Sequence, residues 1–134
     1  MFQFVSNYSE LAGLVLRVVV ALIFLVHGWP KLKNLRMTAE NFNAMGFRPG
    51  ALWGTVVSLN EVIGGLALLV GFLTPLITVL LAGQMVVATL WKIKRGQGLA
   101  GGFELDLLLV ASALVIATLG GGVYSLDTYL GQAL

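Results

Sequence analysis

The 134-residue chain is 58% hydrophobic and only 10% charged, and it carries eight Lys and Arg against six Asp and Glu. A soluble domain is about 25% charged, so this composition excludes an ordinary soluble protein and indicates an all-α membrane protein. The chain has no cysteine and a single histidine, which excludes a disulfide, an iron–sulfur cluster held by thiolates and a bis-histidine haem within one chain.

Four apolar segments are long enough to cross a bilayer, which requires about 20 mostly apolar residues. They cover residues 11–29, 51–72, 75–91 and 103–119. Pro30 should end the first span, a tight turn at 73–75 joins the second to the third, and a glycine-rich loop at 96–102 precedes the fourth. We therefore predict one domain over residues 1–134, folded as a four-helix bundle with up-down-up-down topology.

Loop Lys and Arg residues gather on one side of this predicted bundle. They are Lys31, Lys33, Arg36 and Arg48 after the first span, and Lys92, Lys94 and Arg95 after the third. Because such residues favour the cytoplasmic side, we predict a multi-pass protein of the cytoplasmic (inner) membrane with both basic loops inside and both termini outside. The cluster at 31–36 is most simply a topological anchor, with a specific anion site as the alternative. We expect no nucleic-acid partner.

The first basic loop is predicted to contain a short helix. Thr38 is placed to cap it, Met37 and Phe42 have the spacing of a hydrophobic staple, and Gly46 would end it. We expect this amphipathic segment to lie on the inner membrane surface, with Phe42 and Met45 turned toward the apolar interior.

The two ends of the chain carry weaker signals. The stretch MFQFVSNYSE has no basic n-region, so we expect no cleaved signal peptide and a retained first helix. After the glycines at 120–122, Ser125 is placed to cap a terminal helix that extends to Tyr129, with Asp127 in its first turn.

Glu61 is the leading candidate for function. It lies about ten residues into the second span, roughly 15 Å deep at 1.5 Å per residue. A charge at the bilayer centre costs about 3 kcal/mol on insertion scales, so such a group usually faces the bundle interior and finds a partner. Glu61 shares a helix face with Gly54, Ser58 and Gly65, small residues that permit close helix approach.

Arg17 enters from the opposite side, on a stripe with Gly13, Ala21 and Gly28, and reaches a comparable depth. We therefore predict an ion pair between Arg17 and Glu61. In one interpretation the pair only fixes helix register. In the other, Glu61 exchanges a proton with a bound redox carrier when its partner turns away. Loss of activity in Arg17→Leu with normal assembly would indicate the second interpretation.

His27 is expected near the cytoplasmic end of the first span, at the level of Glu104. A histidine beside a carboxylate can shuttle protons or hydrogen-bond a carbonyl group, and the alternative is an interfacial histidine that caps its helix. We expect no metal site, because one imidazole and scattered carboxylates lack the clustered spacing of zinc ligands.

Only one of Glu104 and Asp106 can face the interior, because they lie about 200° apart on a helix. Glu104 shares a face with Ala111 and Thr118, which we interpret as the packed face. Asp106 is then expected at the surface, paired with one of the basic residues at 92–95. Because a glutamate enters the second span of each half, Glu61 and Glu104 also suggest a parallel repeat of two hairpins.

Several short motifs occur in a characteristic order along nearly the whole chain. They are Leu16-Arg17, His27-Gly28 and Lys31-Leu32 in the first span, Met45-Gly46-Phe47 before the second, Glu61 with Gly64-Gly65-Leu66-Ala67-Leu68 in the second, Met85 and Ala88 in the third, Gly102-Phe103-Glu104-Leu105 opening the fourth, and Tyr124-Ser125-Leu126-Asp127 near the end. In this order the chain resembles the DoxX family of small bacterial and archaeal membrane proteins.

The resemblance implies a four-helix membrane protein with oxidoreductase-like or quinone-linked relatives, and the related DoxD branch is a subunit of thiosulfate:quinone oxidoreductase. It also implies that the characteristic family positions are Arg17, His27, Glu61 and Glu104. In one departure, the final turn often reads Gly-Pro-Gly-Arg in the family and reads GGGV at 120–123 here, which removes an anion contact on the outer face.

Three functions are compatible with these features. The first is a quinone-linked redox subunit that receives electrons from a protein partner or a second substrate. The second is a non-catalytic subunit that assembles or anchors a larger complex, and the third is a carrier for a small solute or lipid with Glu61 as the coupling site.

In the first function the proton-handling residues are Glu61, Arg17, His27 and Glu104. The predicted cofactor contacts are His27, Asn60 and Gln84, although Asn60 and Gln84 are more often helix-to-helix hydrogen-bond groups. The expected partners are membrane lipids and either a partner subunit or a second copy of the chain.

Overall fold

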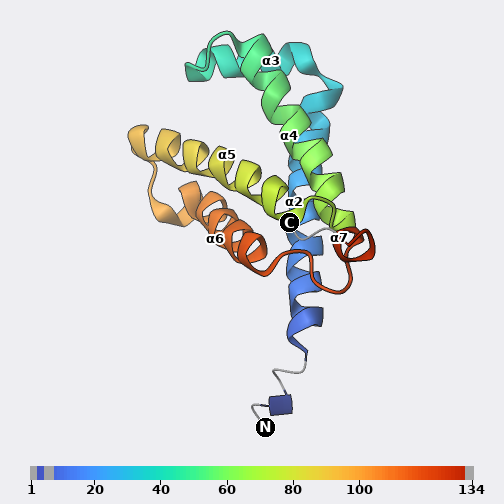
Figure 1. Cartoon of the computed structure of the whole chain (residues 1–134). Helices are drawn as coiled ribbons and strands as arrows, with labels where there is room; N and C mark the ends of the chain where they lie inside the picture. The colour runs from blue at the N-terminus through green and yellow to red at the C-terminus, as the bar shows by residue number, and fades with distance from the viewer. Residues whose placement is uncertain (1–2, 5–7, 132–134) are drawn as a thin grey trace.

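A computed structural model describes residues 3–4 and 8–131, and within these ranges the chain forms helices and turns without a strand (Figure 1). The elements in chain order are α2 (Ser9–Lys33), α3 (Leu35–Met45), α4 (Gly50–Val70), α5 (Thr74–Lys94), the kinked turn η1 (Leu99–Phe103), α6 (Glu104–Leu119) and α7 (Leu126–Tyr129). In the described part, four helical segments are long and apolar enough to cross a membrane: α2, α4, α5 and residues 99–119. The predicted all-α, four-span class is confirmed. The sidedness of the loops and termini stays a prediction, and part of the N-terminal stretch at 1–10 lies outside the described residues.

The first span is longer than predicted. Pro30 does not end α2, which continues to Lys33. Proline removes one backbone donor, but the final turn has other support, because the Lys31 carbonyl accepts from the hydroxyl of Thr38 at 3.0 Å and from the backbone N–H of Asn34 at 3.3 Å. The extra turn keeps Lys31 on the helix, where its side chain has a fixed direction.

The short helix of the first loop is confirmed as α3, but its predicted N-cap is wrong. Asn34 caps it by accepting from the backbone N–H of Met37 at 3.1 Å. Thr38 is buried inside the helix and donates its hydroxyl to carbonyls at 31 and 34 instead. Gly46 ends α3 at φ +95°, a conformation that glycine adopts without strain. The position of α3 at the membrane surface stays a prediction.

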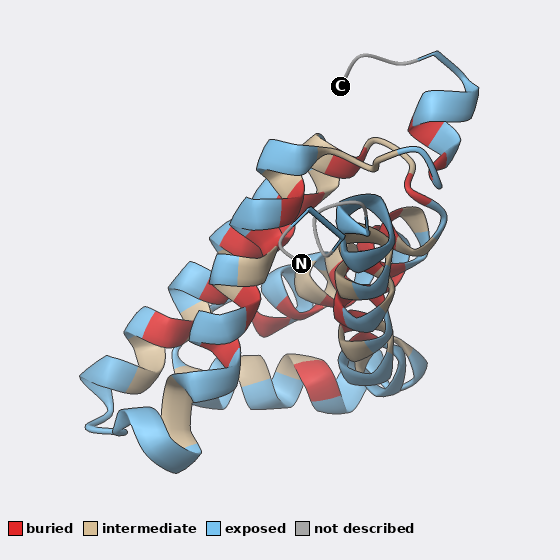
Figure 2. Cartoon of the chain, turned by 90° about the horizontal axis from the view of Figure 1, so that it is seen from below, coloured by how far each residue is buried: buried red, intermediate tan, exposed pale blue. Residues whose placement is uncertain are grey.

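The four spans are arranged as two helix pairs. The largest contacts join α2 to α4 and α5 to α6, and Figure 1 shows the second pair diverging from the first toward the end that carries α3. Phe24, Leu68 and Leu81 form the centre of the core where the pairs meet. Buried segments lie mainly where helices face one another, whereas the outward faces are largely exposed and apolar, as contact with lipid acyl chains requires (Figure 2).

The close approach of α2 and α4 depends on Gly28. A Cβ at this position would lie 2.6 Å from the Cβ of Glu61, so Gly28→Ala must force the two helices apart. We expect it to destabilise the protein by about 1–3 kcal/mol, measured by thermal unfolding in detergent. Gly13→Ala is the matched control in the same helix, because a Cβ there would meet nothing within 4 Å. Equal melting temperatures for the two variants would contradict this role of Gly28.

Candidate functional site

A cavity of about 890 Å³ lies between the two helix pairs, and α3 contributes part of its wall. Its walls are mainly apolar and aromatic and include Phe24, Phe42, Trp53 and Leu109. A few polar side chains also line it: His27, Lys31, Asn41, Asn60, Glu61, Gln84, Lys92 and Asp106. This volume and this combination of apolar walls with few polar groups are typical of sites for small organic ligands.

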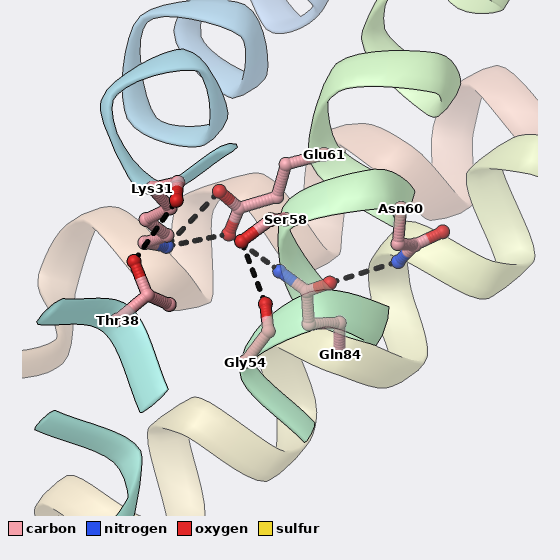
Figure 3. Close-up of polar contacts among 7 residues, drawn as sticks. All are labelled: Lys31, Thr38, Gly54, Ser58, Asn60, Glu61 and Gln84. Atoms are coloured by element: carbon pink, nitrogen blue, oxygen red, sulfur yellow. Dashed lines mark hydrogen bonds and ion pairs between the residues drawn. The ribbon is translucent and has the colours of Figure 1, made fainter. Parts of the chain in front are cut away.

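Glu61 lies at the centre of a polar network on the cavity wall. Its carboxylate accepts hydrogen bonds from Lys31 Nζ at 2.9 and 3.0 Å, and from Gln84 Nε2 at 2.7 Å. Glu61 is only 2% exposed, whereas 35% of the Lys31 side chain is exposed. Figure 3 shows these side chains from α2, α4 and α5 turned toward one another. Three hydrogen bonds from two donor groups therefore fix the direction of the buried carboxylate, and the Lys31 side chain still lines the cavity.

Small residues on both helices make room for this network. Gly28 lies directly against Glu61, and Gly54 lies against Thr38 of α3. Ser58 is fully buried and donates its hydroxyl to the Gly54 carbonyl within its own helix, so it leaves the carboxylate free for Lys31 and Gln84 (Figure 3). The predicted small-residue face around Glu61 is confirmed.

Asn60 and Gln84 form a helix-to-helix hydrogen bond, the alternative to a cofactor contact that such groups more often adopt. The Asn60 Nδ2 donates to Gln84 Oε1 at 2.8 Å, which joins α4 to α5. Because the Gln84 amide nitrogen also donates to Glu61, these bonds fix the amide orientation. Both side chains line the cavity, and their predicted contact with a cofactor stays a prediction.

The predicted ion pair between Arg17 and Glu61 is wrong. Arg17 donates from Nη1 to the Gly121 carbonyl at 2.6 Å and from Nη2 to the Tyr124 carbonyl at 2.7 Å. Glu61 lies beside Gly28, eleven positions further along α2 and thus about 16 Å from Arg17 along the helix axis. The depth estimate failed because the first turns of α4 pack against α3 through Gly50 and Gly54, so Glu61 lies opposite the end of α2 and meets Lys31.

Arg17 instead belongs to a structural cluster at the opposite end of the bundle. Asp127, in the first turn of α7, accepts from the backbone N–H groups of Leu73 and Thr74 at 2.6 and 2.9 Å, and thereby caps the start of α5. Ser125 caps α7 as predicted, by accepting from the Thr128 N–H. Asp127 was predicted in this turn, but its contact with α5 was not, because it joins residues more than fifty positions apart in the chain.

The predicted choice between Glu104 and Asp106 is also wrong. Glu104 is exposed and does not line the cavity; its carboxylate accepts from the Gly101 N–H at 3.2 Å. Asp106 is 8% exposed, lines the cavity and pairs with Lys92 at 2.6 Å. The buried residues of α6 are at 106, 109, 113 and 116, a spacing of three and four that identifies the packed face. The pairing of Asp106 with a basic residue at 92–95 is confirmed, but its surface position is not.

His27 lines the cavity with an exposed ring, and within the described ranges it makes no hydrogen bond or ion pair. It does not contact Glu104 in this structure. Among the residues that the structure describes, no three His, Cys, Asp or Glu side chains gather as metal ligands would.

Lys31 is the main site residue that the sequence analysis missed. It was assigned to a topological anchor, because Pro30 was expected to end the helix. The signal was present in the spacing, since Arg17, Ala21, Phe24 and Gly28 are buried on one face of α2 and Lys31 continues that face by three positions.

The fold and the cavity define a multi-pass α-helical membrane protein with an ion-paired carboxylate buried between its helix pairs. The chain belongs to the DoxX family, whose model matches residues 12–93. That range includes Lys31, Glu61 and Gln84 and ends before α6.

Two relatives match over nearly their whole length. "Inner membrane protein YqjF" of Escherichia coli (strain K12) is 33% identical over 129 residues, which cover 95% of this chain and 98% of the relative. "Putative oxidoreductase CatD" of Bacillus subtilis (strain 168) is 29% identical over 121 residues, which cover 90% of this chain and 88% of the relative. No solved structure matches the chain significantly.

Proposed function

We propose that this protein is the membrane subunit of a quinone-linked oxidoreductase, and that its cavity holds the quinone ring beside Lys31 and Glu61. The observation that carries the proposal is a carboxylate that is 2% exposed and borders an apolar cavity of about 890 Å³. A lipid-soluble carrier needs apolar walls for its ring and chain, and a few polar groups at its oxygens. The name of the Bacillus relative, an oxidoreductase, supports the same class of reaction.

A bound quinone supplies two-electron, two-proton chemistry, in which its carbonyl oxygens become hydroxyl groups. The residues of this chain supply the polar contacts. The Lys31 ammonium is a donor for a carbonyl oxygen, and Glu61, which Lys31 and Gln84 orient, is a carboxyl group that would carry protons to the ring as the ring takes up electrons. Because Lys31 is partly exposed, it also offers a route for protons between the buried carboxylate and the basic end of the bundle. We propose that this end faces the cytoplasm of a cell with an inner membrane.

The electrons must come from outside this chain, which contains no cysteine and only one histidine. We therefore propose a partner subunit with its own redox centre, and membrane lipids around the exposed apolar faces of the helices.

The proposal is tested by purifying the protein in mild detergent and measuring extracted quinone by chromatography. We expect about one quinone per chain, and we expect Glu61→Gln to lose it. The matched control is Glu40→Gln, because Glu40 is exposed and pairs with Arg36 on the surface of α3. Protein without quinone that co-purifies with a large complex would support the anchoring subunit instead. Proton-coupled solute uptake in proteoliposomes, lost in Glu61→Gln, would support the carrier.

A further inference from the structure

A second lysine–carboxylate pair lines the same cavity. Lys92 Nζ lies 2.6 Å from Asp106 Oδ2, and both residues belong to the cavity wall. Asp106 is 8% exposed. This pair comes from α5 and α6, whereas the Lys31–Glu61 pair comes from α2 and α4, so each helix pair contributes one of them.

The lysines of the two pairs occupy corresponding places in the two halves of the chain, whereas Glu61 lies in the middle of α4 and Asp106 in the first turn of α6. Lys31 lies in the last turn of α2 and Lys92 in the last turn of α5, and each meets a carboxylate on the helix that follows in its pair. The predicted repeat therefore relates Glu61 to Asp106, and not to Glu104. A repeat of this kind places two similar polar groups around one shared cavity.

The two carboxylates differ in how far their hydrogen-bonding capacity is used. Glu61 accepts three hydrogen bonds from protein donors. The buried Oδ2 atom of Asp106 lies 2.6 Å from the Lys92 ammonium, which is its ion-pair partner. Within the described residues no second side chain donates to Asp106 as Gln84 does to Glu61, so the carboxylate keeps more acceptor capacity for a ligand in the cavity.

We propose that Lys92 and Asp106 form a second polar anchor of the cavity, so that the ligand is a benzoquinone or naphthoquinone ring held at both of its opposed oxygens. This inference rests on the proposed function and adds the second binding group to it. A carbonyl oxygen only accepts hydrogen bonds, so Lys92 binds it in the oxidised ligand. A hydroxyl group donates, so Asp106 binds it in the reduced ligand. One pair therefore holds both redox forms of the ring in the same place.

The test is to measure the affinity of the full-length protein in lipid nanodiscs for decylubiquinone and for its reduced quinol form. Quenching of tryptophan fluorescence reports binding, because Trp53 and Trp91 line the cavity. We expect Lys92→Met to weaken quinone binding roughly tenfold and quinol binding much less, and Asp106→Leu to weaken quinol binding roughly tenfold and quinone binding much less. Opposite preferences in two variants of one ion pair are not expected if the pair is only structural.

The matched controls are Lys94→Met and Glu104→Gln, two exposed residues on the same two helices that do not line the cavity. We expect both to bind the two forms as the wild type does. Because a single substitution leaves one charge of the pair without its partner, the double variant Lys92→Met/Asp106→Leu is measured as well. It removes both charges and should fold, and we expect it to lose affinity for both forms.

The outcomes separate the two proposals. A wild-type protein that binds neither form contradicts the proposed function itself. If the wild type binds both forms and the double variant binds them with the same affinities as the wild type, only the second anchor is contradicted. The second anchor is also contradicted if each single variant loses affinity for quinone and quinol equally. Such a result would show that the pair supports the structure and does not recognise the ring oxygens.

Discussion

Glu61→Gln is expected to lower quinone-dependent turnover of the assembled enzyme by about 100-fold and to leave the fold intact. Glutamine keeps the shape of the side chain and one acceptor oxygen for Lys31 or Gln84, but it cannot carry a proton to the ligand or hold a negative charge. Loss of a positioned acid or base typically costs at least this factor. Lys31 tolerates the change, because its side chain is 35% exposed and its ammonium can turn to water.

Substitution of the other member of the ion pair, Lys31, should lower stability more than Glu61→Gln does. Lys31→Met leaves the Glu61 carboxylate buried without its counter-charge, so we expect the free energy of unfolding to fall by about 3–5 kcal/mol. Thermal unfolding in detergent measures this change. Lys33→Met is the control, because Lys33 is exposed and its ammonium makes no ion pair among the described residues and lies 6.0 Å from the centre of the Trp29 ring. Equal stability of Lys31→Met and Glu61→Gln would mean that the pair is not held as the structure shows.

Arg17→Leu is expected to destabilise the protein by about 2–5 kcal/mol. The substitution removes the buried guanidinium that donates to the partly buried carbonyls of Gly121 and Tyr124, and an acceptor left without a partner costs up to about 3 kcal/mol when it is fully buried. Asp127 also loses a nearby positive charge. Since these contacts hold the segment at 121–129 against the start of α5, we expect faster amide hydrogen exchange in that segment, measured by mass spectrometry, together with a lower melting temperature.

Arg36→Leu is the control for Arg17→Leu, because 92% of the Arg36 side chain is exposed and it pairs with the exposed Glu40 at 3.6 Å. Folded Arg17→Leu protein should bind quinone with the affinity of the wild type, because Arg17 lies at the other end of the bundle from the cavity. If Arg17→Leu kept normal stability and lost quinone binding, Arg17 would have a role in ligand binding and its structural role would be contradicted.

Much of the candidate site follows from local patterns, but its pairings do not. The face that carries Gly54, Ser58, Glu61 and Gly65 was predicted from spacing alone and is buried. Gln84 was identified as a group inside a span, and its bond to Asn60 is present. The partner of Glu61 was missed because it depends on which turn of α2 lies opposite, and Pro30 concealed the last turn of that helix.

The sequence by itself determined the membrane class, four of the helices, the short helix in the first loop and the buried face of α4. These properties are local, because hydropathy, the 100° turn per residue and the preference of glycine for positive φ act within one segment. Only the tertiary structure decided that Glu61 meets Lys31, that Asp106 replaces Glu104 in the cavity, and that Arg17 supports the opposite end. Those pairings depend on the register between helices, which close contacts such as Gly28 against Glu61 set across the bundle. A shift of one or two residues changes which polar groups meet, and no single helix contains the information that fixes it.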